Sequence, residues 1–325
     1  MGLLLYQNFE GENHQSKGVW KSSGFDEIID KEFFITNFEG TSCFTFVKEN
    51  DLHLSMLQLE IGKINVKQSS NYILEKNQYQ KSLRDFKQAM YEREITKAIF
   101  SRIDQVNGEF NALEIYKALC QKYEGKAFVY LIADDEFGIW IGATPEVLIK
   151  GDENNFSTMA LAGTKAEKQT SWTPKEIEEQ RLVSQFIQTI LEHNAVKNLH
   201  VSDTETVFSG SVYHLSTKFI FQYEISKITK LIRELHPTPA VCGLPRSKAR
   251  ELIREFEPHQ RNFYTGILGR INKSEVQTYV NLRCMEFFKN KADLYVGGGI
   301  TNDSVIESEW DETQIKANTL KSVLV

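Results

Sequence analysis

Apolar residues recur at helical spacing over residues 78–92, where Leu83, Phe86 and Met90 fall on one face. This periodicity predicts an amphipathic helix. Another helix is predicted to begin at Thr173, because the run Thr-Pro-Lys-Glu offers an N-cap threonine, a proline at the first helical position and a glutamate at the third. Further helices are predicted over residues 112–123, 225–235, 246–257 and 307–324.

Short apolar runs bounded by turns predict a series of β-strands. They cover residues 33–35, 43–47, 53–59, 95–103, 126–133, 137–142, 147–150, 156–162, 276–288 and 294–298. Hairpin-like runs interrupted by helices are typical of the α+β class with antiparallel sheets. Residues 237–258 differ, because four of the six prolines lie there. Since proline fixes φ and lacks an amide donor, this segment is predicted to be a stiff loop that shapes a binding site.

Composition narrows the class of protein. Of the 325 residues, 41% are apolar and 25% are charged, which is ordinary for a soluble globular enzyme. The net charge of −6 disfavours a nucleic-acid partner, because nucleic acids select a basic surface. No apolar run approaches the roughly 18 residues that cross a bilayer, so no membrane partner is expected. No linker rich in proline, glycine or serine divides the chain, so we expect one continuous domain.

Two features bear on the compartment. The N-terminus lacks a basic stretch and turns acidic within a few residues, so it does not resemble a signal peptide. The four cysteines lie far apart and form no CxxC motif, so they are predicted to be reduced thiols. Both observations favour a cytoplasmic protein.

Several motifs follow one another in the C-terminal part of the chain. They are HPTPA from His236, RNFYTG from Arg261, NLRC around Arg283, GGGI from Gly297, and ExxExxxK from Glu309 to Lys316. In this order they resemble the chorismate-binding enzymes, which include isochorismate synthase, salicylate synthase, anthranilate synthase component I and aminodeoxychorismate synthase component I. The resemblance implies two stacked antiparallel β-sheets with helices packed outside. It covers residues 76–325, the expected catalytic region, and leaves residues 1–75 as a scaffold portion of the same domain.

Two acidic pairs are candidates for a metal site. Glu176 with Glu179, and Glu309 with Glu312, have i,i+3 spacing on predicted helices, which puts each pair on one helix face. Oxygen ligands of this kind suit Mg²⁺. Both pairs also lie near helix N-termini, where acids are favoured without any metal. The resemblance implies Mg²⁺ as cofactor, with Glu179 and Glu312 as direct ligands and the other two nearby or bridged by water. Gln180 departs from the histidine that is usual in the family.

A base and an acid are implied by the resemblance. Lys97 lies in an apolar strand, where it is either a surface lysine or withdrawn from water, an environment in which an amine can serve as a base. Isochorismate and salicylate synthases place a lysine here to deprotonate the attacking water. Glu146 follows a proline turn, at the family position of a glutamic acid that protonates the departing C4 hydroxyl. Ala162 stands where aminodeoxychorismate synthases carry a nucleophilic lysine, which disfavours that activity.

Further residues are expected to hold a dicarboxylate substrate. Arg283 can bind a carboxylate in bidentate fashion and Lys316 supplies a point charge. The glycine run at Gly297 either turns backbone amides towards an anion or forms a flexible turn. His214 matches a family histidine near the reacting hydroxyl, although read alone it is a satisfied core histidine. The remaining pocket residues implied by the resemblance are Gly163, Thr164, Phe263 and Tyr264.

These residues together predict a Mg²⁺-dependent isochorismate synthase of the menaquinone or siderophore type, with chorismate as its small-molecule substrate. Salicylate synthase is the nearest alternative, because it performs the same first step and then eliminates pyruvate. Anthranilate synthase component I is disfavoured by Lys97, and no obligate glutaminase subunit is therefore expected. A chorismate binder without catalytic activity is the remaining alternative, and it would bind without turnover.

Overall fold

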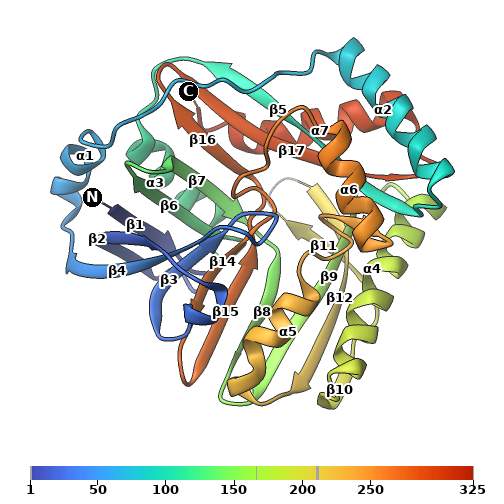
Figure 1. Cartoon of the computed structure of the whole chain (residues 1–325), viewed down its shortest axis with the longest axis horizontal. Helices are drawn as coiled ribbons and strands as arrows, with labels where there is room; N and C mark the ends of the chain where they lie inside the picture. Colours follow the sequence, from blue (N-terminus) through green and yellow to red (C-terminus); the bar gives the residue numbers. More distant parts are fainter. Residues whose placement is uncertain (1, 166, 210–211, 325) are drawn as a thin grey trace.

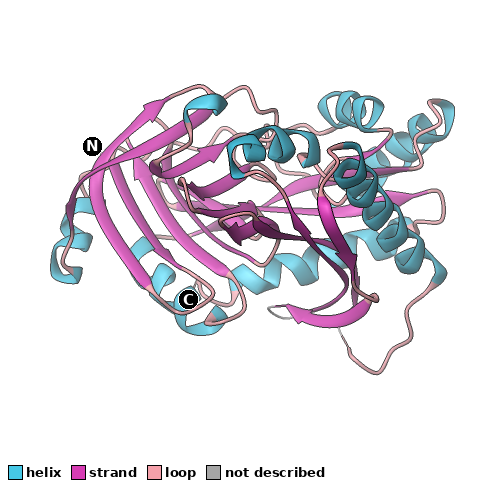
Figure 2. Ribbon diagram, turned by 90° about the horizontal axis from the view of Figure 1, so that it is seen from below, coloured by secondary structure: helices cyan, strands magenta, loops and turns pink. Residues whose placement is uncertain are grey.

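The computed structural model describes residues 2–165, 167–209 and 212–324, and it contains two antiparallel β-sheets with helices packed outside (Figure 1). This arrangement confirms the fold class predicted from the sequence. The strands of both sheets are strongly curved, as the second view makes plain (Figure 2). Within the described residues, no helix is both long and apolar enough to cross a membrane. All four cysteines are buried and free.

The larger sheet has ten strands in the described part of the chain, in the order β13-β5-β17-β16-β7-β6-β1-β2-β4-β3. Its strands are β1 (Gly2–Gln7), β2 (Asn13–Ser22), β3 (Lys31–Thr36), β4 (Cys43–Asp51), β5 (Lys97–Asn107), β6 (Phe128–Asp134), β7 (Gly138–Thr144), β13 (Gly243–Leu244), β16 (Cys284–Phe288) and β17 (Lys291–Thr301). The N-terminal strands therefore belong to the same sheet as β5 and β17, because β1 pairs with β6 in the register Leu4 to Ile132.

The smaller sheet has the order β10-β12-β9-β8-β15-β14, with β11 paired to β12. Its strands are β8 (Val147–Asp152), β9 (Asn155–Lys165), β10 (Lys197–Val201), β11 (Glu205–Ser209), β12 (Val212–Gln222), β14 (Ile267–Ile271) and β15 (Glu275–Val280). The α-helices are α1 (Leu54–Ile61), α2 (Lys76–Glu92), α3 (Ala112–Tyr123), α4 (Pro174–His193), α5 (Ile228–Leu235), α6 (Arg246–Phe256) and α7 (Ile306–Lys321).

Most predicted elements are present, and helix α3 has the predicted bounds. Helix α4 begins as predicted, with a capping box in which the side chains of Thr173 and Glu176 bond each other's backbone amides. The strand predicted over residues 53–59 is wrong, because the His53 side chain accepts from the Ser55 amide and caps helix α1. Strands β1 and β2 were not predicted.

The strand predicted over residues 276–288 is in fact two strands, β15 and β16, which belong to different sheets. Three residues join them, and the last, Arg283, has a left-handed φ of 47°. A residue of this type rarely adopts that conformation, so the surrounding structure must impose it. The break places Arg283 at the junction of the two sheets.

Apolar side chains cover both faces of β1, and they join two parts of the core. Leu3 and Leu5 pack with the residues of α3, whereas Leu4 and Tyr6 pack against β14 and β15 of the other sheet. This alternation follows from the period of two in a strand. Residues at the N-terminus therefore help to hold the two sheets together.

Replacing Leu5 with alanine is expected to lower the free energy of unfolding by about 3 kcal/mol, because Leu5 is fully buried and the change leaves a cavity. Urea unfolding followed by circular dichroism measures this. Val19→Ala on strand β2, where the side chain is 38% exposed, is the control and should change the free energy by less than about 0.5 kcal/mol. Equal effects of the two substitutions would contradict the placement of β1 inside the sheet.

Candidate active site

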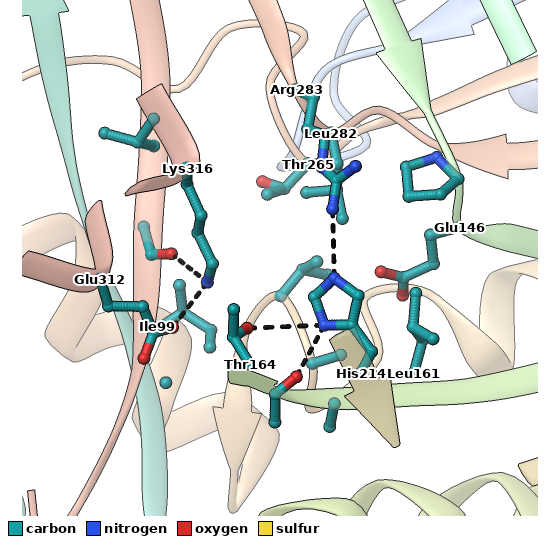
Figure 3. Close-up of a pocket in the computed structure, with 18 of the residues that line it drawn as sticks. Ile99, Glu146, Leu161, Thr164, His214, Thr265, Leu282, Arg283, Glu312 and Lys316 are labelled. Atoms are coloured by element: carbon teal, nitrogen blue, oxygen red, sulfur yellow. Dashed lines mark hydrogen bonds and ion pairs between the residues drawn. The ribbon is translucent and has the colours of Figure 1, made fainter. Parts of the chain in front are cut away.

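A pocket lies where β5 and β17 of the larger sheet meet β9 and β12 of the smaller one and helices α4 and α7. It holds a cavity of about 100 Å³ and opens to solvent. Ten of the residues predicted from the sequence line it: Glu146, Gly163, Thr164, Glu179, His214, Tyr264, Arg283, Gly297, Glu312 and Lys316. Glu312 and Lys316 lie at one side of the pocket and Glu146 at the other, with His214 and Arg283 between them (Figure 3).

Three carboxylates lie against the glycine run of β17. A methyl group added at Gly299 would lie 2.2 Å from Glu179 Oε1. One added at Gly298 would lie 3.1 Å from Glu309 Oε2 and 3.8 Å from Glu312 Oε1. The run is a regular strand paired with β5, so the alternative of a flexible turn is wrong. Glycine is needed here because the carboxylates occupy the space of a side chain.

Each of these carboxylates has a lysine partner. Lys97 Nζ lies 2.9 Å from Glu179 Oε1, and Lys175 Nζ lies 2.5 Å from Glu309 Oε1. Lys316 Nζ lies 2.8 Å from Glu312 Oε1 and donates to the Gly297 carbonyl at 2.9 Å. The three ion pairs neutralise a group of acids that would otherwise repel one another.

The pKa values of these acids follow from burial and neighbours. Burial raises the pKa of Glu179, but attraction by Lys97 and by further lysines outweighs it and leaves the pKa below its usual value. Burial and the Glu312 charge raise the pKa of Glu309, in spite of its partner Lys175. Two glutamates of one cluster thus differ because their local charge balance differs.

The donor set fits a hard divalent cation. Among the described residues, no group of three His, Cys, Asp or Glu side chains is arranged to hold a metal as it stands. The carboxylate oxygens that lie against Gly298 and Gly299 are nevertheless of the type that Mg²⁺ accepts as ligands. Moreover, Glu309 Oε2 is buried and has no hydrogen-bond partner in the described part of the chain. A buried acceptor left unpaired is costly, and a cation would satisfy it.

Glu176 and Gln180 have structural roles on helix α4. The Glu176 carboxylate accepts from the Thr173 amide at 2.9 Å and from the Thr173 hydroxyl, so it closes the capping box. The Gln180 side chain donates to the Ala160 carbonyl at 3.2 Å and to Thr217 Oγ1 at 3.0 Å. Gln180 therefore fastens α4 to β9 and β12, and it holds Glu179 over the pocket.

The predicted base and acid are both buried. Lys97 has no exposed surface, and it lies behind Glu179 rather than on the wall of the pocket. Glu146 lines the pocket between β7 and β8 and is 4% exposed. Burial raises the pKa of Glu146 to about 7, against the opposing attraction of Lys97 and Lys316. This carboxyl therefore keeps a proton available near neutrality.

His214 orients Arg283. Burial, together with the Arg283 charge, lowers the pKa of His214 to about 3, so the imidazole is neutral. Its Nδ1 lies 2.6 Å from the Gly163 carbonyl and 3.5 Å from Thr164 Oγ1, and its Nε2 lies 3.1 Å from Arg283 Nη2. The arrangement assigns the proton to Nδ1, which donates to Gly163, and leaves Nε2 to accept from Arg283. A fixed guanidinium in the pocket is suited to a carboxylate.

One residue that was predicted to line the pocket lies outside it, and several residues of the site were not predicted from the sequence. Phe263 packs its ring against Phe137 and Trp140, at centroid distances of 5.3 Å each, outside the pocket. It is the neighbour of Tyr264, and the two side chains point to different sides of the backbone. Lys175 was missed because its partner Glu309 is distant in sequence. Further lining residues that the sequence did not mark as candidates are Ile99, Val241, Thr265, Leu282 and Tyr295.

Comparison with known proteins gives consistent matches. A family model described as "Chorismate binding enzyme" matches residues 48–325. Isochorismate synthase EntC of Escherichia coli is 28% identical over 247 residues, which are 71% of this chain and 62% of EntC. Isochorismate synthase MenF of Bacillus subtilis is 29% identical over 266 residues, 77% of this chain and 56% of that protein. The chain therefore aligns with only about three-fifths of the length of these relatives.

Two solved structures share the fold. The menaquinone-specific isochorismate synthase MenF from Escherichia coli superposes with a TM-score of 0.81 at 20% identity, covering 100% of this chain and 89% of that one. Anthranilate synthase component I from Streptococcus pneumoniae gives a TM-score of 0.72 at 16% identity, covering 98% and 89%. At these identities the likeness concerns the fold.

Glu179→Gln is expected to weaken Mg²⁺ binding by about tenfold or more, because it replaces a charged carboxylate of the candidate cation site with a neutral amide (tenfold is about 1.4 kcal/mol). Isothermal titration calorimetry measures the affinity. Glu176→Gln is the matched control, since glutamine at this position preserves a capping box, and the affinity should stay unchanged. Weaker binding in Glu176→Gln would make Glu176 a ligand, and undiminished binding in Glu179→Gln would move the metal site elsewhere.

Proposed function

This chain belongs to the family of chorismate-binding enzymes, and we propose that it converts chorismate into isochorismate with the help of Mg²⁺. The relatives named above support this, because EntC and MenF are named isochorismate synthases. One observation carries the proposal beyond the names. A fully buried lysine, Lys97, lies directly behind Glu179 of the pocket wall, and a buried glutamic acid whose pKa is about 7, Glu146, lines the same pocket. A hydration that also expels a hydroxyl needs such a base and acid.

The pocket supplies fixed positive charge for a dicarboxylate substrate. Arg283 would bind one carboxylate through its planar fork, in the orientation that His214 maintains. Glu179 and Glu312 would hold Mg²⁺, with Glu309 beside them, and the cation would supply charge for the ring carboxylate. Lys316 stays at this end through its bond to the Gly297 carbonyl. Such positioning lowers the entropic part of the barrier.

The reaction exchanges one hydroxyl for another. Lys97 accepts a proton from a water molecule as the water oxygen bonds to C2, and the ring double bonds shift. Glu146 gives its proton to the C4 oxygen as the C4–O bond breaks, so the group leaves as water. Lys97 can reach the water only after its ion pair with Glu179 opens, because its Nζ is otherwise held against that carboxylate.

The same residues argue against two related activities. Ala162 lines the pocket, and its methyl side chain cannot act as the nucleophile that aminodeoxychorismate synthases use. Lys97 favours water over ammonia as the attacking molecule, which disfavours anthranilate synthase. Salicylate synthase would use the same base, acid and cation site, so the products must separate it from isochorismate synthase.

With chorismate and Mg²⁺, the protein is expected to form isochorismate alone, identified by liquid chromatography and mass spectrometry. Salicylate together with pyruvate would instead assign it as a salicylate synthase. Anthranilate formed in the presence of ammonium would assign it as an anthranilate synthase component. Binding of chorismate without any product would leave it as a binding protein.

Lys97→Met is expected to lower kcat by about 10³-fold, within the range that a general base contributes. Mg²⁺ binding measured by calorimetry should persist, because the side chain removed is not a ligand. Lys117→Met, at an exposed position on α3, serves as the control and should leave kcat unchanged. Normal turnover in Lys97→Met would exclude Lys97 from the reaction.

The pH dependence should report Glu146. As a general acid it must be protonated, and its pKa is raised to about 7 by burial, so kcat/KM is expected to fall as pH rises above about 7. Below that pH the carboxyl keeps its proton and this limb is flat. Glu146→Gln should be nearly inactive, and its residual rate should lack the fall. A wild-type profile that rises through pH 7 to 8 would contradict the role of Glu146 as the acid.

A further inference from the structure

One edge of strand β5 is completed by side chains instead of a strand. The neighbouring strand β13 pairs only with Lys97 and Ala98. Beyond that point the Ile99 carbonyl accepts from Arg261 Nη2 at 3.2 Å, and the Ser101 amide donates to Glu257 Oε1 at 2.7 Å. An unpaired strand edge buried in the protein would be costly, so these two side chains take the place of a partner strand.

Glu257 and Arg261 form a buried, bidentate ion pair. Arg261 Nη2 lies 2.6 Å from Glu257 Oε1, and Nε lies 2.8 Å from Oε2. The Arg261 side chain is only 3% exposed and that of Glu257 only 2%. Withdrawing both charges from water is expensive, and such a pair often adds little net stability. The pair takes no part in the mechanism described above, so its retention in the interior calls for another explanation.

The same guanidinium reaches two further segments. Arg261 Nη1 donates to the Val241 carbonyl at 2.8 Å and lies 3.3 Å from Thr265 Oγ1. Val241 belongs to the proline-rich loop and Thr265 to the turn before β14. Both residues line the pocket, as does Ile99, whereas neither Glu257 nor Arg261 is among the described residues that line it. Arg261 therefore connects three separate parts of the pocket wall from behind.

The turn that Arg261 supports is strained. Thr265 has a left-handed φ of 61°, which a β-branched residue rarely adopts. Its amide donates to the Asn281 carbonyl at 2.7 Å, and its carbonyl accepts from His236 Nε2 at 2.8 Å. Strain of this kind persists only where neighbouring groups impose it, and it is common at ligand sites.

The strained turn fixes the adjacent tyrosine. The Tyr264 ring stacks on Tyr295 with centroids 5.6 Å apart. Its hydroxyl lies next to β17, because a methyl group added at Gly297 would lie 3.0 Å from it. Tyr264 thus presents its hydroxyl to the pocket only while the turn keeps its shape.

We propose that Glu257 and Arg261 are positioning residues for the substrate pocket. Together they complete the edge of β5 and hold the proline-rich loop and the Tyr264–Thr265 turn as one rigid wall, which sets how tightly the substrate binds. The identity of that substrate as chorismate rests on the proposed function. The rigidity of the wall is independent of which substrate binds.

The geometry determines which kinetic constant responds. Lys97 is held by backbone pairing with Leu244 on one side and Thr301 on the other, so the base keeps its place when the ion pair is removed. The wall touches parts of the substrate that do not react, and such contacts are equal in the ground state and the transition state. Losing them raises KM and leaves kcat nearly unchanged.

Two variants test the proposal. Arg261→Lys keeps the charge but loses the planar fork, and the double variant Glu257→Gln with Arg261→Met leaves no unpaired charge in the interior. In both, KM for chorismate is expected to rise about tenfold with kcat within about twofold of the wild type. The double variant Glu255→Gln with Arg93→Met removes a bidentate but exposed pair at 2.8 and 2.9 Å, and it should change neither constant.

A purely structural role of the pair would lower kcat in proportion to the folded fraction and leave KM unchanged, and that result would overturn the proposal. Amide hydrogen exchange followed by mass spectrometry provides a readout that needs no substrate. Exchange should increase in peptides covering residues 239–244 and 262–267 in both Arg261 variants and not in the control. If the wild type does not convert chorismate, the proposed function is wrong. Hydrogen exchange alone then tests whether Glu257 and Arg261 hold the pocket wall rigid. Unchanged exchange in these peptides would refute it.

Discussion

The site depends on burying acidic oxygens against a stretch of strand β17, Gly297 to Gly299, that carries no side chains. Glu179, Glu309 and Glu312 reach β17 from two different helices, and they fit only because Gly298 and Gly299 leave the space empty. Negative charge concentrated in this way would drive the helices apart. Lysines from three different elements, β5, α4 and α7, offset it. The fold can bring the helices together over the sheet because every acid meets a counter-charge.

Two glutamates of one pocket have pKa values shifted in opposite directions, and their surroundings determine the direction of each shift. Glu146 is buried and no described cation bonds it directly, so burial raises its pKa to about 7. Glu179 is also buried, but Lys97 bonds it directly, and its pKa is lowered. One carboxyl is thereby suited to give a proton and the other to bind a cation. This separation of roles is what acid–base chemistry near neutral pH requires.

Much of this site could be predicted from the sequence, because its residues occur in ordered motifs. The capping box at Thr173 even fixed the start of helix α4 to the residue. What could not be predicted depends on contacts between distant segments. The split of residues 276–288 into two strands follows from the packing of two sheets, and the polar Asn281 and Arg283 at the break look no different from the polar residues inside the strands. In the sequence, nothing distinguishes Arg261 from the other arginines. Its role depends on contacts with Ile99, Val241 and Thr265, which lie elsewhere in the chain. The helix α1 was mistaken for a strand because short apolar runs fit both periods.

Arg283 stands where the chain crosses from β15 in one sheet to β16 in the other, within a three-residue connection. Its guanidinium meets His214 of the smaller sheet, while its backbone carbonyl accepts from the Ala143 amide at the end of β7 in the larger one. Arg283 is therefore bonded to both sheets at once. Any sliding of one sheet over the other would displace it from the acids on α4 and α7. The geometry of the pocket is in this way coupled to the alignment of the two sheets, and distant core substitutions can reach the pocket through that alignment.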